Sequence, residues 1–287
     1  MQTLNMKTKI SGLFRLFRFE LPFTAGICVV LGEILSLGKF PPISTVGLGF
    51  MSVFFISAAS LIVNDYFDLE TDKINAPHRP LPAGLVTERE VILLFITVTA
   101  LGFVAGGLLG ASALVTVVFV WAIGFLYNWR LKKSGLAGNL MVSFSVGMTF
   151  IFGGIAAGSP FEKIVWLFAI MTALINLGEE IAADAMDVDG DGRAGSRSLA
   201  VKLGQGIALK VSAGIFMLAF LVGGSSFLFG WLDWIYLIPI MLFGMIVFYA
   251  TRKLLNPKTP DRRMYIRWIY LSGLGMLFVF LAIRLLI

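Results

Sequence analysis

Long apolar stretches alternate with polar segments along the whole chain, and this alternation predicts membrane-spanning helices. Nine stretches have about the 20 residues that a helix needs to cross a bilayer. They lie near residues 21–38, 43–64, 91–109, 112–129, 138–157, 163–183, 207–229, 234–251 and 267–286. The pattern therefore predicts an all-α, polytopic membrane protein with nine transmembrane helices in one bundle.

The polar connections alternate between long and very short ones, and the long ones carry most of the positive charge. The N-terminal segment and the connections 65–90, 130–137, 184–206 and 252–266 hold 18 of the 23 lysines and arginines. Lysine and arginine accumulate in cytoplasmic loops. We therefore expect a cell-membrane protein whose N-terminus and long loops are cytoplasmic. The loops 65–90 and 184–206 would form a cytoplasmic cap, and an odd number of spans puts the C-terminus outside.

Composition agrees with a lipid bilayer as the partner of this chain. Apolar residues make up 58% and charged residues only 14%, whereas soluble proteins carry about 25% charged residues. The net charge of +6 would suit nucleic acid, but the cations lie between apolar stretches, so we expect none. The one cysteine, Cys28, lies in the first stretch and has no partner for a disulfide within the chain.

An acidic pattern occurs twice, each time at the end of an apolar stretch. Carboxylates recur at i, i+3 and i+7, first at Asp65, Asp68 and Asp72 and then at Asp184, Asp187 and Asp191. This spacing predicts that each set shares one helical face. Carboxylates so close together repel each other unless cations lie between them, and charged groups are costly in a membrane.

The two acidic sets are 119 residues apart, from Asp65 to Asp184, and follow the second and the sixth span. A basic segment punctuated by glycine or proline comes after each set. We interpret this as a weak internal repeat of four helices, about 21–129 and 138–251, with a ninth helix appended. The whole chain, 1–287, would form a single domain.

Oxygen ligands on one side of the membrane suit magnesium, which often bridges a few carboxylates and a substrate phosphate. Two such sets suit a diphosphate held between two metal ions. The alternative without a function is a solvated helix end, where aspartate is common.

Residues 187–192 resemble the start of an EF-hand loop, but the twelfth position of that loop would be Ser198 instead of glutamate. Residues 191–197 are similar to a CDP-alcohol phosphotransferase segment, but that family's downstream paired aspartates do not follow.

Three segments together resemble the UbiA superfamily of intramembrane prenyltransferases. Residues 64–84, Asn-Asp-x-x-Asp-x-x-x-Asp followed by Asn-x-Pro-x-Arg-Pro-Leu-x-x-Gly, match its first signature. Residues 184–191 match its second signature, and residues 127–133 are similar to its Tyr-Ser-x-x-Leu-Lys-Arg segment, continued by Gly138 and Asn139. Arg18 stands where the family has an arginine before its first helix. The resemblance implies helices around a central cavity, two magnesium ions and a polyprenyl diphosphate donor.

The resemblance also assigns roles to candidate residues. The six aspartates are expected to bind the metal ions, with Asp65, Asp68 and Asp187, beside Tyr127 and Lys132, closest to the chemistry. Expected substrate-binding residues are Asn64, Arg18, Arg79, Arg130, Arg193 and Arg197. Guanidinium and ammonium groups would offset charge on the departing pyrophosphate. Alternatively, these cations only set topology, and Tyr127 only anchors the chain at the membrane interface.

The acceptor is a lipophilic molecule whose identity depends on the branch of the family. Members prenylate aromatic quinone or haem precursors, or the hydroxyl of geranylgeranylglyceryl phosphate in ether-lipid synthesis. Short loops and the ending of the second signature favour the ether-lipid branch and a geranylgeranyl donor. Glu179 and Ala183 depart from the arginine and lysine of many members, whereas Glu180 is kept. A cation-coupled transporter is the alternative of another class, but transporters bind their ions near the bilayer midplane.

Overall fold

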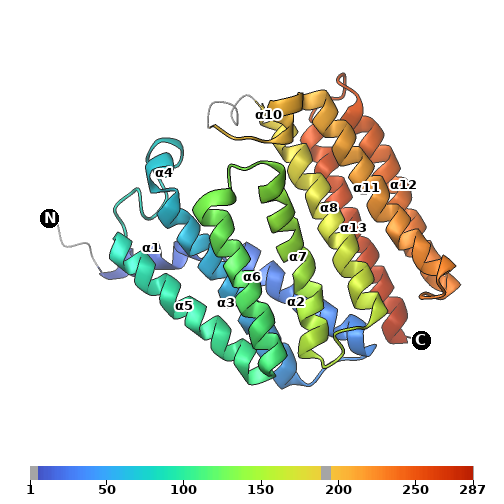
Figure 1. The fold of residues 1–287 in the computed structure, drawn as a ribbon, viewed down its shortest axis with the longest axis horizontal. Helices are drawn as coiled ribbons and strands as arrows, with labels where there is room; N and C mark the ends of the chain where they lie inside the picture. Colours follow the sequence, from blue (N-terminus) through green and yellow to red (C-terminus); the bar gives the residue numbers. More distant parts are fainter. Residues whose placement is uncertain (1–5, 189–194, 287) are drawn as a thin grey trace.

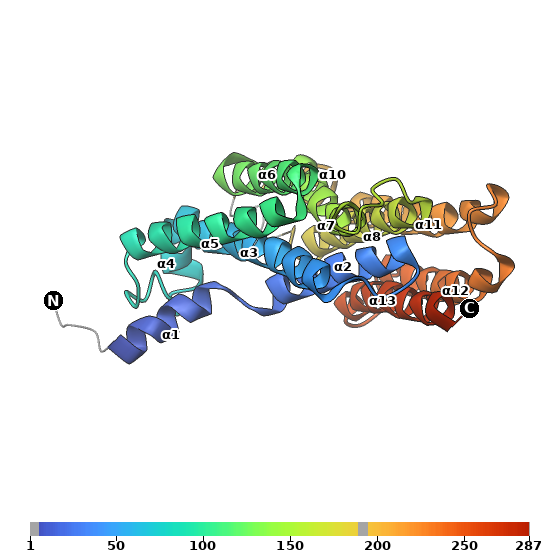
Figure 2. The same cartoon turned by 90° about the horizontal axis from the view of Figure 1, so that it is seen from below.

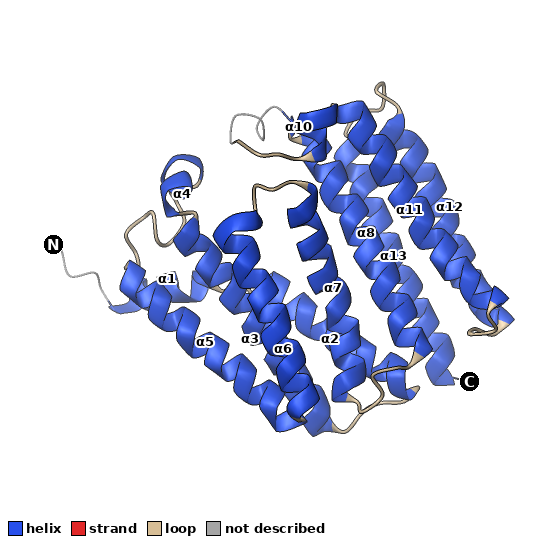
Figure 3. Ribbon diagram, in the orientation of Figure 1, coloured by secondary structure: helices blue, strands red, loops and turns tan. Residues whose placement is uncertain are grey.

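The computed structural model describes residues 6–188 and 195–286, and every regular element in those ranges is a helix (Figures 1 and 3). In chain order these are α1 (Met6–Leu16), α2 (Glu20–Leu37), α3 (Ile43–Phe67), α4 (Leu69–Asn75), α5 (Glu88–Leu109), α6 (Ala111–Leu126), the π-helix η1 (Tyr127–Leu131), α7 (Leu136–Ala156), α8 (Lys163–Met186), α10 (Leu199–Leu203), α11 (Gln205–Leu228), the 3-10 helix η2 (Trp234–Tyr236), α12 (Leu237–Leu255) and α13 (Arg262–Leu286).

Nine helical segments of the described chain are long and apolar enough to cross a membrane, which confirms the predicted number of spans. They are α2, α3, α5, α6 with η1, α7, α8, α11, η2 with α12, and α13. The boundaries differ in places that matter. Helices α3 and α8 continue to Phe67 and Met186, so both acidic motifs begin inside the last helical turn and not after it.

Helix α1 was not predicted from the sequence. Gly12 and Leu16 are buried, and Leu16 packs into a hydrophobic cluster with residues of α3, α5 and the loop before α5. Ile10 and Phe14 are exposed on the other side. Figure 2 shows α1 at one end of the molecule, beside α4 and α5.

Two packing features hold the bundle together. The larger hydrophobic core gathers residues of α2, α7, α8, α11, α12 and α13. Helices α2 and α7 approach closely because a Cβ atom at Gly32 would collide with the backbone of Phe150, and one at Gly153 with the backbone of Val29 and Glu33. Small residues permit this close approach between membrane helices.

Helices α4 and α10 and the connection between η1 and α7 lie at the same end of the bundle (Figure 3). Both acidic motifs are at this end, since α3 and α8 each finish there (Figure 1). The fold therefore brings residues that are more than 100 positions apart to one face of the molecule.

Candidate active site

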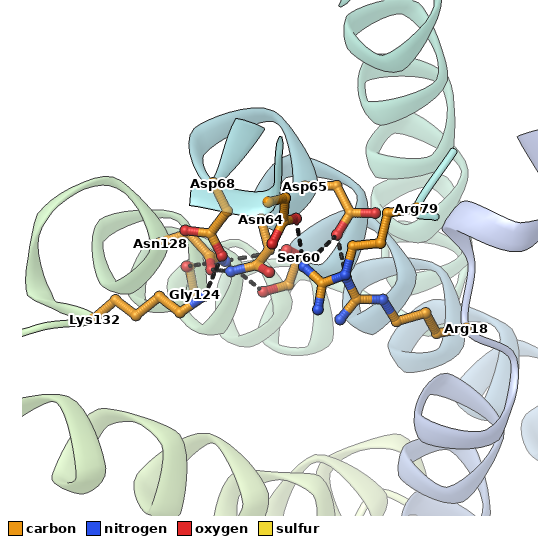
Figure 4. A network of polar contacts seen from close by, with 10 residues as sticks. Arg18, Ser60, Asn64, Asp65, Asp68, Arg79, Gly124, Asn128 and Lys132 are labelled. Atoms are coloured by element: carbon orange, nitrogen blue, oxygen red, sulfur yellow. Dashed lines mark hydrogen bonds and ion pairs between the residues drawn. The ribbon is translucent and has the colours of Figure 1, made fainter. Parts of the chain in front are cut away.

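The first acidic motif begins with Asp65, whose side chain is almost completely buried at the end of α3. Asp65 forms an ion pair with Arg18, and Nη1 of Arg79 lies 3.7 Å from the same carboxylate (Figure 4). Arg79 also binds Asp72, at 2.5 Å. Arg18 has a φ of 43°, in the left-handed region that is unfavourable for residues with a Cβ atom. Strain of this kind is typical of functional sites.

The first three carboxylates do not share one continuous helix, which corrects the expectation from their spacing. Helix α3 ends at Phe67, and α4 begins at Leu69. The backbone N–H of Asp68 still donates to the carbonyl of Asn64 at 2.9 Å, and that of Asp72 to Asp68 at 2.8 Å. The chain therefore stays wound through the break, while Arg79 lies between Asp65 and Asp72, and Asp68 turns to Lys132.

Asn64 and Asn128 join α3 to η1 beside this motif (Figure 4). Asn64 Nδ2 donates to Asn128 Oδ1 at 2.8 Å. Asn128 Nδ2 in turn donates to the carbonyl of Ser60 at 3.1 Å, and to Ser60 Oγ and the carbonyl of Gly124 at 3.0 Å each. Exchanging the amide oxygen and nitrogen of Asn64 would bring its oxygen to 2.9 Å from Lys132 Nζ, so this amide lies between Asn128 and Lys132.

Lys132 forms an ion pair with Asp68 at the outer edge of this network. It is placed there by the π-helical turn η1, in which the N–H of Lys132 donates to the carbonyl of Tyr127 at 2.8 Å. A turn of this kind inserts one extra residue and is frequent at functional sites. It also explains why the predicted span 112–129 is α-helical only to Leu126.

The second acidic motif ends α8 and is held by other elements. Asp184 accepts a hydrogen bond from Asn139 Nδ2 of α7 at 2.9 Å. Asp187 forms an ion pair with Arg263 at the start of α13. The remaining residues predicted for this motif, Asp191 and Arg193, lie outside the described residues.

Tyr127 lines the same cavity as Asn64, Asn128 and Lys132. Glu179 and Ala183 occupy the positions where the sequence pattern led us to look for cations. In the described structure the cation beside Asp187 instead comes from α13.

The loops that follow η1 and α8 also touch. The N–H of Arg197 donates to the carbonyl of Lys133 at 3.1 Å. Gly135 has a φ of 73°, and a Cβ atom there would overlap the carbonyl of Arg197. This junction ties the segment carrying Lys132 to the loop that follows the second motif.

Two candidate cations form no ion pair with the acidic residues that the structure describes. The guanidinium of Arg130 lies 4.6 Å from the ring centre of Trp129, and the side chain of Arg197 is exposed. Their contact with substrate stays a prediction. Arg18, Asp65, Arg79 and Asp72, in contrast, form one connected set of ion pairs. Beside this set Asp68 pairs with Lys132, and Asn64 donates to Asn128.

A cavity of about 420 Å³ leads from this polar set into the bundle. Its mouth includes Asn64, Asn128 and Lys132, and the rest is lined mainly by apolar residues of α3, α6 and α7. Ligand cavities typically have this size and an apolar lining with a few polar groups. The site thus combines charged groups at one end with space for an apolar chain below them.

The donor set fits magnesium that is shared with a phosphate ligand. Within the described residues, no three acidic, histidine or cysteine side chains are close enough to hold an ion by themselves. Magnesium typically takes only one or two carboxylates and completes its shell with water and phosphate oxygens. The aspartates at the mouth meet that requirement.

Sequence reasoning missed three contacts in this site. Asn128 and Asn139 lie in the segment that matched a family signature, so their polar side chains between apolar spans were a usable signal. Arg263 gave no signal, because its loop carries four other cations of equal weight. Its pairing with Asp187 depends on how α13 packs beside α8.

Comparison with known proteins gives consistent matches. The UbiA prenyltransferase family matches residues 25–284. A digeranylgeranylglyceryl phosphate synthase of Pyrococcus furiosus is 33% identical over 220 residues, 77% of this chain and 78% of that protein. The synthase of Methanothermobacter thermautotrophicus is 32% identical over 270 residues, 91% and 92% of the two chains.

Solved structures share the fold. One from work on digeranylgeranylglyceryl phosphate synthase in membranes superposes with a TM-score of 0.85 at 27% identity, covering 97% of this chain and 99% of that one. A UbiA homologue of Archaeoglobus fulgidus, bound to GPP and Mg²⁺, has a TM-score of 0.69 at 16% identity, covering 96% and 100%.

Proposed function

The chain belongs to the UbiA prenyltransferase family, and from this premise we propose that it transfers a geranylgeranyl group to geranylgeranylglyceryl phosphate in ether-lipid synthesis. The observation that carries the proposal is the apolar cavity that opens directly below the set of aspartates and cations. A prenyl diphosphate has the same two parts. The names of the relatives at 32–33% identity supply the acceptor.

The proposed site holds the donor diphosphate between the two acidic motifs. One or two of Asp65, Asp68 and Asp72 would hold one Mg²⁺ together with the diphosphate, and one or two of Asp184, Asp187 and Asp191 would hold a second. Magnesium would supply charge neutralisation on the diphosphate oxygens. Arg18, Arg79 and Lys132, which bind the first motif's carboxylates here, are within reach of the same oxygens.

The chain's own residues then favour departure of pyrophosphate. The bond between the allylic carbon and the diphosphate oxygen breaks, and the electron pair leaves with the pyrophosphate, whose growing charge Lys132 and Tyr127 stabilise. The acceptor hydroxyl forms the new carbon–oxygen bond, and its proton passes to the pyrophosphate. The apolar cavity wall excludes water, which limits hydrolysis of the allylic group.

The proposed orientation puts this site at the cytoplasmic side, with the C-terminus outside. It rests on the concentration of lysine and arginine in the long loops. The loops that carry α4 and α10 would form the cap over the site. The internal repeat of four helices stays a prediction.

The direct test supplies purified protein with labelled geranylgeranyl diphosphate, Mg²⁺ and a panel of acceptors, and identifies the product. We expect an ether formed on geranylgeranylglyceryl phosphate and no transfer to aromatic rings. Prenylation of an aromatic acceptor alone would overturn the ether-lipid assignment, and a lack of pyrophosphate release with every acceptor would overturn the enzyme.

Asp68→Ala gives a matched pair with Glu70→Ala in the same test. Asp68 faces Lys132 at the cavity mouth, so its loss should abolish turnover. The side chain of Glu70 is 83% exposed and binds only Lys73 among the ion pairs described. Glu70→Ala should therefore leave turnover near that of the wild type.

A further inference from the structure

Helix α1 has three different faces around its circumference. Gly12 and Leu16 are buried against the protein. On one side of this buried face, Ile10 and Phe14 are 48% and 57% exposed. The remaining face is exposed and polar, and consists of Thr8, Ser11 and Arg15. A helix with separate apolar and polar faces that are both exposed is typical of one that lies in a membrane interface.

The length and charge of α1 agree with this position. Its 11 residues are too few to cross a bilayer, and α1 is not one of the nine candidate spans of the described chain. Its sequence contains lysine and arginine but no acidic residue, as is common for helices at a membrane surface. Figure 2 shows α1 beside α4 and α5, at the edge of the molecule.

A row of phenylalanine rings connects the apolar face of α1 to two membrane-spanning helices. Phe14 stacks on Phe19, which lies between α1 and α2, and Phe19 contacts Phe54 of α3, with ring centres 6.1 Å apart in both pairs. The row continues from Phe54 to Phe50 at 5.8 Å, and from Phe50 to Phe23 of α2 at 5.4 Å. Phe54 lies near the middle of α3. The apolar face of α1 is therefore continuous with a surface at bilayer depth.

The other side of α1 packs on the loop that carries Arg79. Nη2 of Arg15 donates to the carbonyl of His78, the residue before Arg79, at 3.0 Å. A Cβ atom at Gly12 would lie only 3.1 Å from Cβ of Leu85, so the helix and the loop are in close contact. A displacement of α1 would thus disturb the first acidic motif's cations.

Arg18 depends on α1 more directly. Helix α1 ends at Leu16 and α2 begins at Glu20, so Arg18 is the middle residue of a very short connection. Its φ of 43° is unfavourable for a residue with a Cβ atom, and its guanidinium pairs with the buried Asp65. A strained residue keeps its conformation only while the surrounding elements are fixed. The position of Arg18 therefore depends on where α1 is held.

We propose that α1 lies at the boundary between headgroups and acyl chains, in the leaflet on the side of the acidic motifs, and that this docking positions Arg18. Ile10 and Phe14 contact the acyl chains. The partner of the apolar face is the lipid bilayer, because the row of rings runs from this face onto helices that cross the membrane. The location of α1 is independent of the proposed prenyl transfer, whereas the role of Arg18 as a ligand of the diphosphate rests on it.

Spin labels on α1 test its location. Cys28 is the only cysteine, so Cys28→Ala provides a background for Ile10→Cys and Phe14→Cys. Thr8→Cys and Ser11→Cys, on the polar face of the same helix, are the matched controls. In nanodiscs we expect labels at positions 10 and 14 to collide more with oxygen, which concentrates in the bilayer, and labels at 8 and 11 more with a water-soluble nickel chelate. Equal collision ratios at all four positions would overturn the docking of α1.

Phe14→Ser tests whether the docking positions Arg18, and it needs no change at Cys28. We expect KM for the prenyl diphosphate to rise about 10-fold, the effect of weakening one charge-assisted contact. Phe14→Leu, which keeps an apolar side chain, should restore the wild-type KM, and Ser11→Ala should not change it. Ile10→Ser should raise KM in the same way, which keeps the test decisive if Phe14→Ser does not fold.

The two measurements separate the ways in which these ideas could fail. A role of Phe14 in folding alone would lower Tm and the amount of active enzyme without changing KM, and that result would overturn the positioning of Arg18. A wild type that releases no pyrophosphate with any acceptor would overturn the proposed function, while the spin labels would still decide the location of α1.

Discussion

Replacing Asn128 by alanine tests how the mouth of the cavity is held together. Asn128 donates to three acceptors on Ser60 and Gly124 and accepts from Asn64. Hydrogen bonds between membrane helices average about 0.6 kcal/mol, so the loss of its three bonds to α3, two donated to Ser60 and one accepted from Asn64, should cost about 2 kcal/mol. For a chain of this size that corresponds to a decrease of about 4 °C in Tm.

The same replacement should affect catalysis more than binding. Without Asn128, the amide of Asn64 loses its partner and Lys132 loses a neighbour that fixes its position. We expect kcat for pyrophosphate release to fall about 10-fold. KM for the donor should change little, because Arg18 and Arg79 bind the first motif without involving Asn128. The assay is steady-state release of pyrophosphate in nanodiscs, together with thermal unfolding in detergent.

Asn176→Ala supplies the control for this prediction. Its Oδ1 atom on α8 is buried and has no hydrogen-bond partner among the described residues, so its removal should cost less and leave kcat unchanged. Asn128→Ser, which restores a hydroxyl of the kind that the family signature carries, should recover part of the rate. Normal Tm and kcat in Asn128→Ala, or losses equal to those of Asn176→Ala, would refute the reasoning.

Three further predictions test other parts of the molecule. Gly135→Ala should lower Tm by more than Gly84→Ala. Both glycines have a positive φ, which costs alanine about 1–2 kcal/mol, but only Gly135 also faces a backbone carbonyl. Equal decreases in Tm would contradict the contact between the two loops. Lys132→Ala should reduce pyrophosphate release strongly and Lys132→Arg should recover only part, whereas a residue that only sets topology would tolerate arginine fully. A cysteine replacing Ala76 should be labelled only from the cytoplasmic side, and one replacing Ser159 only from outside; the reverse pattern would invert the topology.

The spans and the two acidic motifs could be predicted because their signals are local. A bilayer fixes the length of an apolar helix, and the repeated spacing of Asp65, Asp68 and Asp184 is visible without any tertiary structure. The break after Phe67 could not be predicted, because the helical spacing of the aspartates continues unchanged across it and helix ends are poorly defined by sequence. The π-helical turn at Tyr127 has no sequence pattern that would predict it.

The partners of the acidic residues could not be predicted for a different reason. Arg263 and Asp187 are 76 positions apart, and their contact exists only because α13 packs beside α8. The residues that line the cavity are equally hidden. Phe152 is one of 26 phenylalanines, and only the packing of α3, α6 and α7 places it beside the cavity.

The pairing of acidic residues in the first motif has a consequence for how ligands bind. Asp65, Asp68 and Asp72 each already have a basic partner, so the first motif is internally compensated before any ligand arrives. A divalent ion that takes the carboxylates would release Arg18, Arg79 and Lys132, and a diphosphate that takes these cations would release the carboxylates. Each ligand therefore frees the groups that the other requires, and binding of the two must be thermodynamically linked, with each raising the affinity for the other by the same factor.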